Sequence, residues 1–355
     1  MEPLGNATTT ARNQTATPRR SKSYGYSRRS LGVELASRFG TTPGHLTAVR
    51  VTTNRGIPKP RNLNDQVDPE HIALLVKKEW KLSYVTPLYQ FRHTQLKSYS
   101  KQLATFIVTE KQKGVAVEIG AETGFKVVFT ALLGLAEGED AETVFIQIYS
   151  KPVFATNGEA AKVVWSGWLS CIAGEADFLR SLPPDFTCLP LFGASGAESL
   201  TALVKSWFGK TFDCQFGPLA INSTSLQWLA ALWTACNPDV NIRYLKLAWI
   251  IPAQPPLDVS YTVHSQDAWE LWNSIQQEGG LKDKVDIKEV TRFIRGLESN
   301  FFCHFRIHLS AGSLIKVSTS LGSAHQDGKI RISSSDMMRS ILSLLTECAL
   351  LKMPI

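Results

Sequence analysis

In four segments of the first half of the chain the sequence has a periodicity of two residues. They are residues 115–119 (VAVEI), 125–133 (FKVVFTALL), 143–149 (TVFIQIY) and 162–172 (KVVWSGWLSCI). These segments are rich in β-branched and aromatic residues, and polar or glycine-containing turns separate them, which is typical of β-strands. Because consecutive strands with short connections usually pair with each other, the pattern predicts an antiparallel meander.

Helical patterns flank this block of strands. Asp68, Pro69 and Glu70 are expected to open a helix over 69–80, because aspartate accepts free backbone N–H groups and proline is tolerated in the first turn. Apolar residues at three- and four-residue steps predict further helices at about 94–111, 200–208, 226–233, 286–300 and 335–351, with another beginning near Asp267. Strands are expected at 245–251 and 257–263. Since helices and strands form separate blocks, the sequence predicts an α+β fold of antiparallel meander sheets with packed helices.

The last third of the chain predicts a second meander. Apolar and polar residues alternate in 303–309 (CHFRIHL), 314–320 (LIKVSTS) and 329–332 (KIRI). Three strands there would place apolar side chains on one face and basic side chains on the other. The residues expected on the basic side are His304, Arg306, His308, Lys316, Lys329 and Arg331.

Positive charge is concentrated near the N-terminus. The 355 residues have a formal net charge of +7, but residues 1–63 hold eleven basic and two acidic residues and so carry +9, which leaves −2 for the rest. All nine tryptophans lie from Trp80 to Trp272. A segment with little to bury cannot offset the entropy of ordering its backbone, about 1–2 kcal/mol per residue. We therefore expect a disordered basic tail at 1–64, an N-terminal subdomain at 65–180 and a C-terminal subdomain at 181–355.

The sequence offers little that resembles a catalytic or metal site. No segment has the composition of a membrane span or a signal peptide, so a soluble intracellular protein with no membrane partner is expected. The six cysteines lack the paired spacing of zinc sites. His304 and His308 have a spacing that suits chelation on a helix, whereas a strand is expected there. No enzymatic activity, cofactor or metal ion is predicted.

The tail contains two short motifs. Thr17 precedes Pro18 and two arginines, which is typical of a proline-directed phosphorylation site, and the arginine and lysine residues of 19–29 match a nuclear import signal. Phosphate at Thr17 would add about −2 of charge and weaken contact with an anionic partner. The basic tail and the basic strand face suit sequence-independent contact with nucleic acid, and a solvated, solubilising surface is the alternative.

Several longer segments of the body follow one another in a characteristic order. Among them are TPLY (86–89), FIVTEKQKGVAVE (106–118), TCLPLF (187–192), WFGKTFDCQFGPLAIN (207–222), HFRIHLSA (304–311) and SAHQDGKI (323–330). From about residue 65 to the C-terminus these segments resemble the vertebrate centromere protein L family. The tail departs from that pattern.

The resemblance implies a non-enzymatic subunit of the constitutive centromere-associated network, which is part of the inner kinetochore. Such a subunit pairs with centromere protein N as a heterodimer and works with other subunits of the network, including centromere protein C. The resemblance further implies contact with the centromeric nucleosome and its DNA through the complex, a location at the centromere and kinetochore of chromosomes in the nucleus, and a role in chromosome segregation during mitosis.

Two hypotheses connect this role to residues. An edge of the C-terminal meander would pair with a strand of the partner, because unpaired edge amides and carbonyls favour strand addition. The residues expected to build the sheet behind that edge are Phe305, Ile307, Leu309, Ile315 and Val317. The residues expected to face DNA are Arg306, Lys316, Lys329 and Arg331, together with the tail. The alternative is a stand-alone DNA-binding protein without sequence specificity, which would bind duplex DNA without a partner.

Overall fold

A computed structural model describes residues 57–58, 68–112, 125–136, 138, 140–150, 161–235, 244–279, 284–335 and 337–353. Within the expected tail only β1 (Ile57–Pro58) is described, and it pairs with β12 (Lys284–Val285). The rest of the tail with Thr17, and the strand expected at 115–119, lie outside the described residues.

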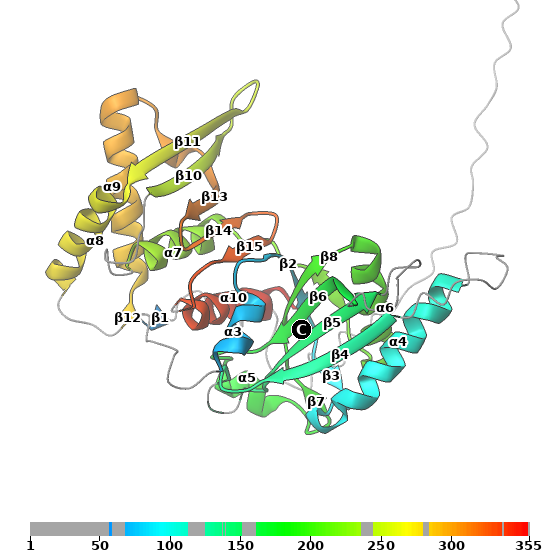
Figure 1. Cartoon of the computed structure of the whole chain (residues 1–355). Helices are drawn as coiled ribbons and strands as arrows, with labels where there is room; N and C mark the ends of the chain where they lie inside the picture. Colours follow the sequence, from blue (N-terminus) through cyan, green and yellow to red (C-terminus); the bar gives the residue numbers. More distant parts are fainter. Residues whose placement is uncertain are drawn as a thin grey trace, which may run out of the picture. The chain divides into compact units, whose positions relative to one another are not determined.

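An eleven-stranded antiparallel sheet runs through the described part of the chain (Figure 1). Its strand order is β11-β10-β13-β14-β15-β2-β8-β6-β5-β4, with β9 paired to β2. The half around the first meander comprises β4 (Phe125–Leu132), β5 (Thr143–Ser150), β6 (Lys162–Ser170), β8 (Leu191–Gly196) and β9 (Phe216–Pro218). The other half comprises β10 (Tyr244–Ile251), β11 (Leu257–His264), β13 (Ser313–Thr319), β14 (Gly322–His325) and β15 (Lys329–Ile332). A separate small sheet pairs β3 (Leu88–Tyr89) with β7 (Phe186–Thr187). The α+β prediction is confirmed.

Strand β2 (Glu79–Val85) joins the two halves of the sheet, and the prediction of a helix over 69–80 is wrong at its end. Helix α3 (Pro69–Leu75) begins as expected, with the Asp68 side chain accepting the Glu70 N–H at 2.9 Å, but it stops at Leu75. Lys77 then takes a left-handed φ of 63°, which turns the chain. Pairing of β2 with β15 and β8 buries Trp80 and exposes its neighbours. Tertiary contacts therefore determine that this segment is a strand and not the end of a helix.

The strand predicted at 303–309 is also wrong. Helix α9 (Ile287–Phe305) starts at a capping box formed by Asp286 and Glu289, as the sequence indicates, and then continues to Phe305. The side chains of residues 303–306 are all exposed rather than alternately buried, and Arg306 ends the helix with a φ of 57°. The short alternation of apolar and polar residues in 303–309 therefore belongs to a helix end followed by a turn, and not to a strand. The real neighbours of β13 are β10 and β14, and β14 was not predicted.

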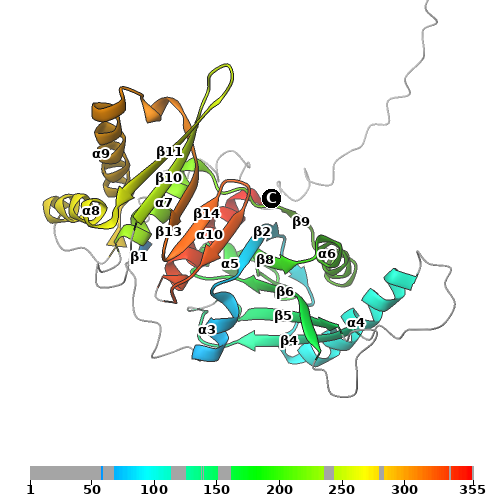
Figure 2. The same ribbon diagram turned by 45° about the horizontal axis from the view of Figure 1, so that its top comes forward.

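Helices cover the two faces of the sheet unequally. One face packs against α7 (Ser223–Thr234), α8 (Ser265–Gly279), α9 and α10 (Met338–Lys352) around buried Trp80, Trp168, Trp233 and Trp249. The other face is covered on β4, β5, β6 and β8 by α4 (Leu96–Gln112) and α6 (Glu198–Phe212), and α5 (Ala176–Ser181) follows β6. On β10, β11, β13, β14 and β15, and at residues 79–81 of β2, that second face is open, as Figure 2 shows for β13 and β14.

Candidate interaction surfaces

A row of basic side chains crosses the open face of the sheet. Residues that are directly paired in neighbouring strands lie on the same face, so the strand register places each side chain. Lys316 of β13, His325 of β14, Lys329 of β15 and Lys81 of β2 are paired in succession. The three lysines are exposed and His325 is half-buried. The row therefore presents its charge to solvent.

A second row lies two residues along each strand from the first. It consists of Lys246, Ser318, Ser323, Arg331 and Glu79, on β10, β13, β14, β15 and β2 respectively. Lys246 and Arg331 are exposed, and hydroxyl groups fill the positions between them. We call the surface formed by Lys81, Lys246, Lys316, His325, Lys329 and Arg331 the basic face.

A shallow groove of about 530 Å³ lies on the basic face beside β11. It is lined by Tyr244, Lys246, Ala248, Ser260, Thr262, Lys316 and Ser318. Ammonium groups and hydroxyls are the groups that hydrogen-bond to phosphate oxygens without reading base sequence. The groove thus has the chemistry of a phosphate-backbone contact.

The basic face continues onto α6 through Lys205. Its ammonium group donates to the Ser83 hydroxyl at 2.9 Å and lies 5.8 Å from the centre of the Phe192 ring. Burial lowers the pKa of Lys205, nearby Glu198 opposes that shift, and the charge of Lys81 adds to it.

Three of the four residues predicted to face DNA lie on this surface, and one does not. Lys316, Lys329 and Arg331 share the open face. Arg306 instead caps the C-terminus of α9, where its guanidinium lies 5.7 Å from the centre of the Phe302 ring. The sequence did not single out Lys81 or Lys246, because their places depend on which distant strands pair with β2 and β10.

The residues predicted to build the partner-binding edge are dispersed. Ile315 and Val317 lie in β13, whose two sides are already paired with β10 and β14, so β13 is not an edge. Leu309 is buried in a 3₁₀ turn and Ile307 is half-buried before it. Phe305 is at the end of α9 and is 58% exposed. The sheet instead ends at β11 and β4, the outermost strands in the described order.

An aromatic ladder of Tyr261, Phe301 and Phe305 leads from β11 to the end of α9. The Tyr261 and Phe301 rings are 5.1 Å apart edge to face, and the Phe301 and Phe305 rings are 4.5 Å apart. The Tyr261 hydroxyl donates to Asn300 Oδ1 at 2.9 Å, which ties the edge strand to the helix. Burial and then the charge of Asp267 raise the pKa of Tyr261, so its hydroxyl stays protonated. The ladder places an exposed aromatic ring beside an open strand.

The edge strand itself carries further apolar surface on the same side of the sheet. Leu257 is 44% exposed, and Val259 is half-buried. Both alternate along β11 with polar Asp258 and Ser260, which point to the open face. A strand that exposes both backbone groups and apolar side chains is a template for pairing with another chain.

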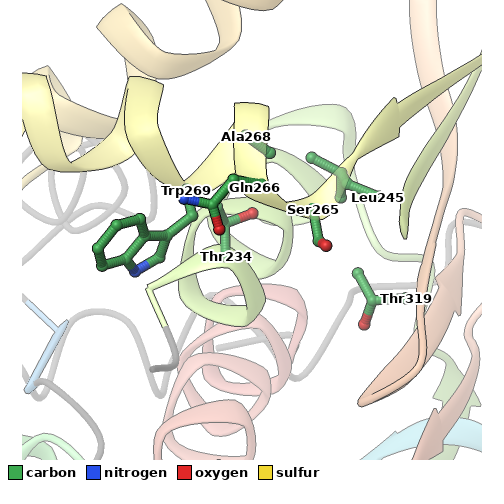
Figure 3. A pocket seen from close by; sticks show the side chains of 7 residues that line it. All are labelled: Thr234, Leu245, Ser265, Gln266, Ala268, Trp269 and Thr319. Carbon is green, nitrogen blue, oxygen red and sulfur yellow. The ribbon is translucent and has the colours of Figure 1, made fainter. Parts of the chain in front are cut away.

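A small pocket of mixed polar and apolar lining lies where α7, α8, β10 and β13 meet (Figure 3). Its volume is about 40 Å³, and it is lined by Thr234, Leu245, Ser265, Gln266, Ala268, Trp269 and Thr319. Since one buried water needs roughly 10–15 Å³, this volume suits a few waters and not an organic cofactor.

Cys214 and Cys348 lack the features of reactive thiols. Burial raises the pKa of Cys214 to about 12 and that of Cys348 to about 11, so both thiols are protonated at neutral pH. Among the residues that the structure describes, no three His, Cys, Asp or Glu side chains are grouped so that they could hold a metal ion. In the same part of the chain, no helix combines the length and apolar character needed to cross a membrane.

Comparison with known proteins identifies the family. A family model described as centromere protein L matches residues 74–350. Centromere protein L of Danio rerio is 64% identical over 355 residues, which are 100% of this chain and 95% of that protein. The Homo sapiens protein of the same name is 46% identical over 298 residues (83% and 86% of the two chains), and that of Xenopus tropicalis is 40% identical over 348 residues (95% and 97%). With a family model over most of its length and relatives that align along nearly all of it, this chain belongs to the centromere protein L family.

Proposed function

We propose that this protein is a non-catalytic subunit of the inner kinetochore that pairs with centromere protein N and supports recognition of centromeric nucleosomes. Its family membership assigns it to the centromere and kinetochore in the nucleus. Contacts with other subunits of the network, including centromere protein C, and with the nucleosome would then form through the complex. Kinetochore assembly and chromosome segregation in mitosis depend on such contacts.

The observation that carries the proposal is the open β11 edge with the aromatic ladder beside it. Backbone pairing supplies affinity in strand addition, and apolar pockets or anchors beside the strand supply specificity. Phe305 has the features of such an anchor, because buried aromatic residues dominate the binding energy of many interfaces. The partner strand would continue the sheet beyond β11, and its apolar side chains would cover Phe305 and Leu257.

Proline substitutions at two adjacent residues of β11 test this pairing. Successive backbone N–H groups of a strand point to opposite sides, so of Val259→Pro and Ser260→Pro one removes a bond to β10 and the other removes an outward donor. The variant that keeps its melting temperature is the one altered on the outer edge. We expect that variant to lose co-purification with centromere protein N. Undiminished pairing by that folded variant would exclude β11 as the interface.

We also propose that the basic face lies along DNA in the complex. Lys and Arg side chains that neutralise phosphates release counterions, so affinity falls with salt by roughly 0.9 log units per contact for each log unit of salt. Replacing Lys316, Lys329 and Arg331 by glutamate should weaken binding of the heterodimer to a DNA duplex and flatten its salt dependence. A control variant with glutamate at Lys97, Lys101 and Lys162, which are exposed on α4 and β6, changes the net charge equally. Equal losses of DNA affinity in the two variants would mean that DNA binding depends on net charge and not on the basic face.

A further inference from the structure

Asp327 is an acidic residue that borders the basic face at the turn between two of its strands. It lies in the turn between β14 and β15, where Gly328 adopts a φ of 84°. Its carboxylate is 2.8 Å from Nδ1 of His325, 3.4 Å from the ammonium group of Lys329 and 3.7 Å from that of Lys81. The Lys81 ammonium group also donates to the Asp327 backbone carbonyl. One carboxylate therefore contacts three of the basic side chains.

The contacts of Asp327 come from three different strands. Lys81, His325 and Lys329 form one cross-strand row, and Asp327 closes that row at its turn. The backbone N–H of Lys329 donates to Asp327 Oδ1 at 3.2 Å, which fixes the direction of the carboxylate. Burial would raise the pKa of Asp327, but hydrogen bonds from His325 and Lys329 and the charges of His325 and Lys81 outweigh it and lower the pKa. The side chain is therefore a fixed anion at neutral pH.

A carboxylate held by two ammonium groups and an imidazole occupies the place that a phosphate oxygen would take. Cations that already have a counter-anion within the protein attract fewer solution counterions, so fewer are released when DNA binds. We infer that Asp327 is a built-in counter-anion that masks Lys81 and Lys329 beside His325 and limits the affinity of the basic face for duplex DNA. The inference rests on the proposed DNA contact and assigns a regulating residue to it.

The masking divides the basic face into two parts. Lys246, Lys316 and Arg331 carry the contact with phosphates, whereas the row at Asp327 contributes only when a phosphate displaces the carboxylate. A phosphate can displace the carboxylate only when the DNA backbone lies close to the row. The masking therefore favours DNA that the whole complex holds in place over DNA that meets the single subunit by diffusion.

The test compares Asp327→Asn with Asp258→Asn in the full-length chain. Each variant removes one negative charge from the same sheet face, because Asp258 is exposed on β11 and shares the orientation of Ser260 and Thr262. Asparagine keeps an oxygen acceptor for the Lys329 N–H, and Asp327→Ser serves as a second uncharged variant if asparagine alters the melting temperature. Binding of a fluorescent DNA duplex is measured from about 50 to 200 mM salt, the range over which phosphate contacts change affinity strongly.

We expect Asp327→Asn to bind DNA about three- to tenfold more tightly at low salt, with a steeper salt dependence by roughly one to two released ions. Asp258→Asn should change affinity less than twofold. Equal effects of the two variants, or weaker binding by folded Asp327→Asn, would overturn the inference, since weaker binding would mean that Asp327 positions the cations for phosphate. If replacing Lys316, Lys329 and Arg331 by glutamate also leaves DNA binding unchanged, the proposed DNA contact fails as well.

Discussion

Phe305 packs against Phe301 one turn earlier in α9, with ring centres 4.5 Å apart, and yet Phe305 is 58% exposed whereas Phe301 is 5% exposed. The inner ring belongs to the core and also contacts Tyr261 of the edge strand. The outer ring adds little to folding, because much of its apolar surface remains in water. This pairing of a buried and an exposed aromatic residue beside an open strand marks the surface that we assign to the partner.

Replacing Phe305 by alanine should weaken pairing with centromere protein N by about tenfold or more, as expected for an aromatic anchor. The folded state should lose no more than about 1 kcal/mol, because the side chain is largely exposed. Binding measured by calorimetry, with unfolding measured by urea, separates the two effects. Leu133→Ala is the matched control, since Leu133 is 60% exposed in the turn after β4. Equal losses of binding in the two variants would remove Phe305 from the interface.

Arg306 and Lys316 should respond differently to charge reversal. Arg306→Glu changes a side chain at the end of α9, away from the rows of the basic face, whereas Lys316→Glu changes the first row beside the groove. We expect Lys316→Glu to lower the affinity of the heterodimer for DNA and reduce its salt slope by about 0.9. Arg306→Glu should leave the slope unchanged. A reduced salt slope for Arg306→Glu would mean that the end of α9 also contacts DNA.

Trp80 links the two halves of the sheet and should be among the most costly residues to remove. It is 1% exposed, its indole N–H donates to the Leu75 carbonyl at 2.8 Å, and its ring lies 6.0 Å from that of Trp168. Trp80→Ala should lower the free energy of unfolding by about 3–5 kcal/mol, the usual cost of deleting a buried aromatic side chain. Trp269→Ala, at a half-buried position on α8, should cost clearly less in the same urea titration. Similar losses would mean that the β2 junction is not central to stability.

Cys303 should react with a thiol reagent well before Cys214 and Cys348. Cys303 is exposed on α9, whereas burial raises the pKa of Cys214 to about 12 and that of Cys348 to about 11. The thiolate is the reactive form, and a raised pKa keeps the thiol protonated as pH increases to about 9. Peptide mapping after labelling at pH 7 and pH 9 should show Cys303 modified at both values and the two buried thiols largely unmodified. Early labelling of Cys214 would contradict the structure around α6.

Local patterns in the sequence predicted the elements whose identity depends on neighbours along the chain. The β-branched and aromatic residues of 143–149 predicted β5 correctly, and the Asp286 capping box located the start of α9. Residues 79–85 were misassigned in part because β2 is defined by partners from residues 191–194 and 329–331, far away in sequence. Seven alternating residues at 303–309 could not distinguish a strand from a helix end.

The same limit applies to the candidate sites. Lys316, Lys329 and Arg331 could be grouped from the sequence because β13 and β15 are close along the chain. Lys81 joins them only through the pairing of β2 with β15. The open edge could not be identified from alternation at all, since β13 and β11 have similar patterns and only the strand order shows which of them is outermost.

Hydrogen exchange of the free protein and of its complex with centromere protein N tests the central claim most directly. The described sheet ends at two strands, β11 (Leu257–His264) and β4 (Phe125–Leu132), so each serves as the control for the other. Strand addition at β11 predicts slower exchange of its outward amides in the complex, together with protection of peptides that contain Phe305, and no change in β4. Protection of β4 with unchanged exchange in β11 and around Phe305 would contradict the account.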